Sequence, residues 1–487
     1  METNNEKQSR GRKKEQFDIT SHGGLLFVVI IGIAVMLVAL NYVFQHSGTL
    51  RQSLRKTERI NKAIEEAGGD PTGDRLLRTL IEADSAIVDE INNIKNEEGM
   101  PDQVFVRDIP AKDNIAVHVM NEFRGVEEKT YNRLRSQISV SGPWSYEPQG
   151  LKENGNIMAT YSPQRDRIRD MLDKPDVRFE QDMIGTENGL VPDDKNAETD
   201  WFYVTLEECE IAKSLENKDM VGAMKSLTYI LRFAELVSHS KFVVMRKQGA
   251  DIRENALRIL QTMVYDPKFG SVETKAMNDL LISQLQKWPN DRKCWIGDRA
   301  SSLRVYDLLR RGRVSEALEP EDLDELYRLN VLGEVRDTSV RGKKQETSME
   351  AKIAFFKTSD IDKDQIQYLK AMRTVVDSCS KPFYQRLPIL DEIEDHFKKL
   401  QGSKEYVAIA PILLRYIREG MQFQAEDKAR VEAWVLALAT KRKFTVKPGT
   451  LDPVRGKPYQ VSRIATPEGS LIVVSYGGGT NKVEIPE

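Results

Sequence analysis

Residue types that commonly carry out acid–base or metal chemistry are scarce in this chain. Five histidines occur among its 487 residues, and Glu392 and His396 have the i, i+4 spacing that places two side chains on one face of a helix. A di-iron bundle needs Glu–His pairs from two helices together with further carboxylates, and the sequence has no second copy of such a pair. Glu392 and His396 therefore fit a surface charge pair better than a pair of metal ligands.

The cysteines and the short catalytic motifs also give no indication of an enzyme. Cys209, Cys294 and Cys379 are far apart and no CxxC occurs, which excludes a zinc ribbon or a thioredoxin motif. We expect three small, buried apolar side chains instead. HExxH, GxSxG and P-loop motifs are absent, so we assign no catalytic residue, metal or cofactor. Glycoside hydrolysis needs only two suitably spaced carboxylates, so a hydrolase using acidic residues stays open.

A basic stretch near the C-terminus is the candidate interaction surface. Residues 441–460 hold six lysines and arginines against one acid, Asp452, and aromatic residues are interleaved with them. Anionic lipid or an acidic protein partner would suit such a surface, although a solvated basic face is the simpler interpretation. The net charge of −3 gives no indication of nucleic-acid binding. The candidate residues are Lys441, Arg442, Lys443, Arg455, Lys457 and Tyr459.

An uncharged segment near the N-terminus predicts where the protein is located. Residues 23–44 form a run that would rise about 33 Å as a helix, enough to cross a hydrocarbon core of about 30 Å. The run is longer than the apolar region of a signal peptide and lacks an A-x-A-like cleavage site, which favours an uncleaved signal-anchor. The short basic tail over 1–22 favours a cytoplasmic N-terminus, although basic residues on both sides leave the reverse orientation open. In a bacterium this predicts a single-pass inner-membrane protein with a periplasmic body.

The body is predicted to be mainly α-helical. We expect a juxtamembrane helical stalk over 45–100, an irregular acidic segment over 101–205 and a helical domain over 206–335. Within the irregular segment, Ser162 and Pro163 indicate the start of one helix. A polar linker over 336–348, a second helical domain over 349–441 and a β-hairpin tail over 442–487 follow. Apolar residues at helical spacing indicate antiparallel helices, including Met224, Leu227, Leu231 and Ala234, and then Ile252, Ala256, Leu260 and Met263.

Two β-type runs near the C-terminus predict the hairpin. "PYQVSRI" (458–464) and "SLIVVSY" (470–476) flank the turn "ATPEG". Because an isolated hairpin is marginally stable in water, we expect it to pack on the Ala-rich helix over 425–440, with Ile472 or Val473 facing inward. The glycine-rich "YGGGTNK" (476–482) is expected to be a flexible tail.

The hairpin residues carry a resemblance to a known family. The pattern DPxxGxPY…SYG resembles the C-terminal β-motif of the major pseudopilins of type II secretion, and its residues here are Asp452, Pro453, Gly456, Pro458, Tyr459, Ser475, Tyr476 and Gly477. The wider pattern of anchor, helical pairs, Ala-rich helix and hairpin resembles uncharacterised membrane-anchored proteins of planctomycete-type bacteria. This second resemblance implies no particular activity.

These patterns together predict a non-enzymatic protein. The expected fold is mainly α, with an N-terminal transmembrane helix, a helical-hairpin body and a small C-terminal β-hairpin. The expected function is a membrane-tethered scaffold or interaction protein of the cell envelope. Its partners would be the lipid bilayer and other envelope proteins, with no nucleic acid. The alternatives are a pseudopilin-like component of a secretion assembly and an anchored envelope hydrolase.

Overall fold

The computed structural model describes residues 93–99, 104, 109–135, 138–139, 145–146, 148–180, 194–310, 358–402, 409–443, 450–467, 469–477, 479 and 481–487. All of them belong to one compact unit, Ala83–Glu487. The predicted basic tail, the transmembrane segment over 23–44 and the linker over 336–348 lie outside the described residues. Among the residues that are described, no helix combines the length and the apolar character needed to cross a membrane.

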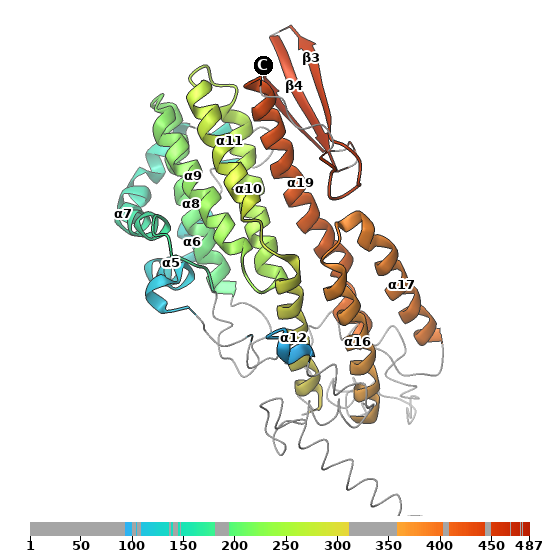
Figure 1. Ribbon diagram of the computed structural model, residues 1–487. Helices are drawn as coiled ribbons and strands as arrows, with labels where there is room; N and C mark the ends of the chain where they lie inside the picture. Colours follow the sequence, from blue (N-terminus) through green and yellow to red (C-terminus); the bar gives the residue numbers. More distant parts are fainter. Residues whose placement is uncertain are drawn as a thin grey trace, which may run out of the picture. The chain divides into compact units, whose positions relative to one another are not determined.

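The described unit is mainly helical and ends in a small antiparallel sheet, as the sequence predicts (Figure 1). A short 3-10 helix, η1 (Ala111–Asp113), precedes the α-helices, and a two-stranded ladder is formed by β1 (Ile138–Ser139) and β2 (Ser145–Tyr146). The α-helices are α5 (Ile115–Phe123), α6 (Glu128–Arg135), α7 (Pro148–Leu172), α8 (Asp194–Glu216), α9 (Met220–Ser238), α10 (Val243–Met263), α11 (Ser271–Gln286), α12 (Asp291–Arg310), α16 (Thr358–Ser378), α17 (Phe383–Gly402), α18 (Ile409–Leu414) and α19 (Ile417–Lys441).

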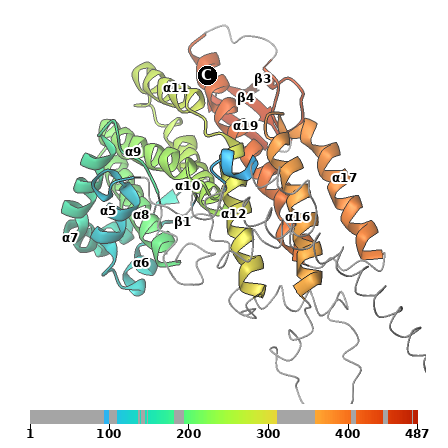
Figure 2. The same cartoon turned by 60° about the horizontal axis from the view of Figure 1, so that its bottom comes forward.

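The predicted apolar stripes form the core between consecutive helices. Helix α9 packs between α8 and α10 (Figures 1 and 2). The side chain of Asp219 begins α9 by accepting a hydrogen bond from the Gly222 amide at 3.0 Å. Every residue of the two predicted stripes is buried, namely Met224, Leu227, Leu231 and Ala234 in α9 and Ile252, Ala256, Leu260 and Met263 in α10.

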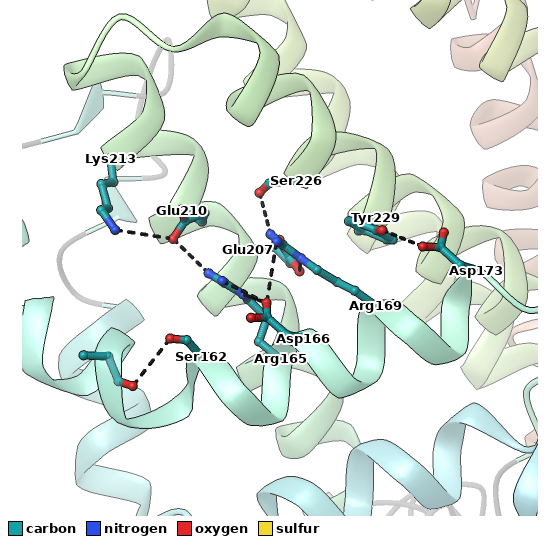
Figure 3. A network of polar contacts seen from close by, with 11 residues as sticks. Ser162, Arg165, Asp166, Arg169, Asp173, Glu207, Glu210, Lys213, Ser226 and Tyr229 are labelled. Atoms are coloured by element: carbon teal, nitrogen blue, oxygen red, sulfur yellow. Dashed lines mark hydrogen bonds and ion pairs between the residues drawn. The ribbon is translucent and has the colours of Figure 1, made fainter.

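The segment over 101–205, predicted to be irregular, contains α5, α6, α7 and the first part of α8. The predicted helix start at Ser162 is wrong, because α7 begins at Pro148 and Pro163 lies inside it. Pro163 has no amide to donate to the carbonyl oxygen of Ala159, four residues earlier. The hydroxyl of Ser162 donates to that oxygen instead, at 3.4 Å (Figure 3). A serine before the proline thus helps the helix to continue where the sequence pattern predicts a start.

Charged side chains hold α7 against α8 and α9 (Figure 3). The guanidinium of Arg169 donates through Nε to Glu207 at 2.7 Å, through Nη2 to the other Glu207 oxygen, and to Ser226 at 2.8 Å. Glu207 is fully buried. Burial opposes the charge of Arg169, but the hydrogen bonds and the charge of Glu207 outweigh burial and raise the pKa of Arg169. The bidentate geometry and the added hydroxyl make this ion pair a structural one.

A second cluster attaches residues 93–99 to α12 and α16. The carboxylate of Glu97 accepts hydrogen bonds from Arg292 at 2.6 Å, from Arg299 at 2.7 Å and from Arg373. Burial alone would raise the pKa of Glu97, but the arginines lower it. Because Arg292 and Arg299 belong to α12 and Arg373 to α16, one carboxylate joins two helices that also pack directly on each other (Figure 2).

Helix α19 is the common neighbour of the C-terminal elements. It contacts α10, α11 and α17 along its length and carries the sheet. In the predicted Ala-rich helix over 425–440, Ala425, Ala429 and Ala433 are buried. Close approach is clearest at Gly420, where an added Cβ would lie 2.7 Å from the Trp295 ring of α12. Small residues therefore let the chain's last described helix fit between its neighbours.

The Arg169–Glu207 pair predicts a large effect of removing one partner. We expect Glu207→Ala to destabilise the protein by about 3–5 kcal/mol, because it leaves the largely buried Arg169 charge with only the exposed Asp166, at 3.7 Å, as a counterion. Denaturant unfolding of the two proteins measures the difference. Asp279→Ala is the control, since it removes an exposed i, i+4 pair with Lys275 and should change stability by less than about 0.5 kcal/mol. Equal effects of the two substitutions would show that the buried pair does not hold α7.

Candidate functional site

The C-terminal sheet has three strands, one more than the sequence predicts. They are β3 (Gln460–Thr466), β4 (Gly469–Tyr476) and β5 (Asn481–Pro486), in the order β3-β4-β5 and all antiparallel. The prediction of a flexible tail over 476–482 is wrong for the residues described there. Gly477 and Gly479 adopt positive φ values of 61° and 92°, which glycine tolerates, and the chain returns along β4 as β5.

The sheet packs on α19 through β4 and β5, as predicted for the hairpin (Figure 1). Both residues named as inward-facing candidates, Ile472 and Val473, are buried. Val483 and Ile485 of β5 are buried as well, so the third strand adds to the apolar contact. The turn glycines let the chain reverse direction and form the extra strand. In the sequence alone, glycines of such a turn look the same as those of a flexible segment.

Asp452 joins the loop before the sheet to the turn after β4. This residue is 3% exposed, and its two carboxylate oxygens accept the amides of Val454 and Gly477, each at 2.7 Å. The backbone of Asp452 also exchanges hydrogen bonds within the loop, donating to the Lys457 carbonyl at 2.8 Å and accepting from the Gly456 amide at 2.7 Å. The first and last parts of the DPxxGxPY…SYG pattern therefore meet at one buried carboxylate.

Gly456 allows this loop to lie against α17. Its φ is +66°, and an added Cβ would lie 2.7 Å from the ring of Tyr384. The Tyr384 amide donates to the Pro453 carbonyl at 3.4 Å, which fixes the first turn of α17 against the loop. The glycine is thus required both by its backbone conformation and by close contact. Pro458 pairs with Leu451 in an isolated antiparallel bridge at the loop's ends.

Polar side chains add further attachment points between the sheet and the helices. The hydroxyl of Tyr459 donates to Glu432 of α19 at 2.6 Å, and Lys441 donates to the Pro486 carbonyl at 2.7 Å. Gln261 of α10 donates to the Glu484 carbonyl of β5. Burial raises the pKa of Glu432, and burial together with the Glu432 charge raises the pKa of Tyr459. The raised pKa keeps the Tyr459 hydroxyl protonated at neutral pH, so it remains the donor in this hydrogen bond.

The strand β3 differs from the rest of the sheet in its exposure. The side chains of Gln460 through Ala465 are all exposed, so neither face of this strand is covered along six residues. Val461 is 44% exposed and Ile464 is 47% exposed. Within the part of the chain that the structure describes, β3 pairs with β4 and its other edge has no partner strand.

The predicted basic surface is divided into two parts. Lys441, Arg442 and Lys443 lie at the end of α19, where Lys441 reaches the last residues of β5. Tyr459 contacts Glu432, which lies nine residues before Lys441 in α19. The two contacts are therefore about 13 Å apart along the helix axis. The exposed residues Arg455 and Lys457 precede Tyr459. Lys441 and Tyr459 thus hold the sheet in place, whereas Lys443, Arg455 and Lys457 remain exposed at its two ends.

A small cavity lies elsewhere, between α16, α17, α18 and α19. Its volume is about 250 Å³, and its apolar lining includes Leu390, Phe397 and Leu414. Its one acidic lining residue, Glu394, accepts a hydrogen bond from Arg418 at 2.7 Å. The charge of Glu394 is therefore neutralised by a neighbour, and the cavity presents mainly an apolar surface.

The cysteines and His396 are the remaining sequence candidates. Cys209 and Cys294 are buried, Cys379 is half-buried, and none forms a disulfide. The surroundings of Cys294 are less apolar than expected, since Gln424 donates a hydrogen bond to its sulfur at 3.0 Å. Burial raises the pKa of the Cys294 thiol to about 11. His396 hydrogen-bonds Gln367 at 3.1 Å. Among the residues that the structure describes, no three His, Cys, Asp or Glu side chains converge on a common point.

The hydrogen bonds that two backbone amides donate to Asp452 predict that replacing it with asparagine lowers the stability of the protein. An asparagine side chain at this position would retain one oxygen but direct an NH₂ group at the second amide, so we expect Asp452→Asn to cost about 1–3 kcal/mol. Thermal unfolding and amide exchange at Gly477 measure the loss. Asp219→Asn is the matched control, because Asp219 accepts one amide and asparagine caps a helix equally well. If both variants keep wild-type stability and Gly477 stays protected, Asp452 does not fasten the sheet.

Comparison with known proteins gave no match of any kind: no model of a protein family, no curated protein and no solved structure is significantly similar to this chain.

Proposed function

We propose that this protein is a membrane-tethered, non-enzymatic interaction protein of the cell envelope, in which the helical body is a scaffold for the C-terminal sheet. The uncharged segment over 23–44 supports the tether, because its length and composition match a transmembrane helix. The short basic segment before it favours a cytoplasmic N-terminus and an extracytoplasmic body.

The combination of firm attachment and exposure in the sheet supports a binding role. Asp452 and Tyr459 fasten the sheet at the end where its loop enters, and Lys441 fastens it at the opposite end. The strand β3 nevertheless leaves both of its faces exposed along six residues. Proteins usually protect an exposed edge strand, because it is a template for pairing with another chain. A fixed sheet with an open edge is therefore a surface suited to a partner.

The two alternatives receive less support. In a pseudopilin-like component, we would expect the hairpin to lie against a long N-terminal helix. Among the described residues, the sheet packs on α19, the last described helix of the chain. A hydrolase requires two carboxyl groups facing one substrate. The cavity beside α17 has one acidic side chain in its lining, Glu394, and Arg418 already neutralises it. The interaction protein remains the function that the described residues support best.

The tether and the binding role are tested together by charging the middle of the apolar segment. We expect Ile33→Arg with Leu37→Arg to release the full-length protein from membranes, because each arginine at a helix centre costs about 2.5–3.5 kcal/mol of insertion. Alkaline carbonate extraction measures release. Chemical cross-linking followed by purification from detergent-solubilised membranes measures partners, and we expect a stable partner set that the double variant loses.

The control adds the same two charges to exposed positions of the body. Val221 and Val272 are 74% and 73% exposed, so Val221→Arg with Val272→Arg should leave both the membrane association and the partner set unchanged. A wild-type protein found in the soluble fraction would overturn the tether. A membrane-bound protein recovered without any partner would overturn the binding role.

A further inference from the structure

We infer that β3 binds an extended, acidic protein segment by strand addition, so that the partner becomes a fourth strand of the C-terminal sheet. This inference rests on the proposed interaction function and names the partner's chemistry. Strand addition uses main-chain hydrogen bonds for affinity and alternate side chains for specificity. The observations that carry it are the geometry of the free edge, its lack of protection and the charges around it.

The hydrogen-bond pattern of the sheet shows which β3 residues face outward. The Glu487 amide donates to the Ser470 carbonyl at 2.8 Å, so the backbone of Ser470 faces β5. Because backbone groups alternate between the two sides of an antiparallel strand, Leu471 faces β3, and its partner Ile464 faces β4. The adjacent residues on β3, Arg463 and Ala465, therefore present their N–H and C=O groups to the free edge. Val461 does the same, because it lies two residues before Arg463.

Among the residues that the structure describes, the edge lacks the features that normally prevent pairing. Natural edge strands are shortened, interrupted by proline, charged or covered by another element. Here β3 has seven residues, no proline and one charged residue, Arg463. Arg463 forms an ion pair with Glu487 at 2.8 Å. This pairing weakens the protection that the arginine charge would give the edge against strand pairing. The exposed Val461 and Ile464 add apolar contact area on opposite faces.

The charges around β3 indicate an acidic partner. Arg455 and Lys457 are exposed just before the strand, and Lys443 is exposed at its opposite end, near Glu487. A strand with acidic side chains would therefore meet the cations Arg455 and Lys457 at one of its ends, whereas Lys443 at the other end lies near the carboxylate of Glu487. Antiparallel pairing with a second copy about the middle of β3 would place Arg463 opposite Arg463 and would present no acidic side chain from β3 to the surrounding cations. An anionic bilayer offers phosphates but no main-chain groups to pair with the edge.

The test uses the full-length protein in detergent micelles and a fluorescent heptapeptide in which glutamate alternates with valine and isoleucine. We expect Val461→Pro to weaken peptide binding roughly fivefold to tenfold, because proline removes one outward N–H without removing a bond to β4. Fluorescence anisotropy measures the affinity. Val461→Thr keeps the amide and should bind as wild type does. Amide exchange at Gly477 verifies that the sheet of each variant remains folded.

Two further measurements address the charges. Replacing the glutamates of the peptide by lysines should abolish binding, and Arg455→Glu with Lys457→Glu should weaken binding of the acidic peptide severalfold. Raising the ionic strength from about 0.05 M to about 0.5 M should weaken it as well, because the Debye length shortens. Equal binding of acidic and basic peptides, or binding to anionic vesicles in place of the peptide, would overturn the inference.

The partner set recovered by cross-linking separates this inference from the proposed function. If Val461→Pro loses a partner that wild type and Val461→Thr both retain, strand addition is supported. If all three proteins recover the same partners, the interaction function stands and strand addition is overturned. If wild type recovers no partner, the proposed function fails, whatever the affinity for the peptide.

Discussion

The carboxylate of Asp452 accepts hydrogen bonds from two backbone amides that are 23 residues apart in the chain, Val454 and Gly477. An ionised carboxylate has two acceptor oxygens, and here each is used within a buried site. This contact closes the loop before β3 onto the turn after β4. A three-stranded sheet with a limited core of its own is thereby held in one conformation on α19. The exposure of β3 depends on this arrangement, because only a firmly held sheet can leave one strand unsupported.

The helical body relies on the same kind of interaction on a larger scale. Glu97 accepts hydrogen bonds from three arginines of α12 and α16, and Glu207 of α8 accepts them from Arg169 of α7. Asp427 of α19 is likewise buried against Arg253 of α10. Buried ion pairs of this kind contribute modestly to net stability, but removing one partner is costly, so they fix which helices are neighbours. Glu97, Glu207 and Asp427 are therefore explained by the packing of the helices.

The sequence predicts much of this fold where its periodicity is strong. The stripes in α9 and α10, the small residues of α19 and the inward side of β4 are confirmed by burial. Three features were not predictable from local patterns. The helix α7 passes through Pro163, where the Ser162 hydroxyl donates to the carbonyl that proline leaves free. The strand β5 depends on positive-φ turns that resemble a flexible glycine tract. The basic stretch separates into two ends of the sheet, which depends on its tertiary packing.

Residue-resolved amide hydrogen exchange of the full-length protein in detergent micelles tests the central claim most directly. A fixed sheet with one open edge predicts slow exchange at Ile472 and Gly477 and at the inward-facing amides of Ser462 and Ile464. It predicts fast exchange at the outward-facing amides of Val461, Arg463 and Ala465. Protection at these three positions would mean that the edge is already covered, and fast exchange throughout β3 and β4 would mean that the sheet is not held on α19. Either result would contradict the account.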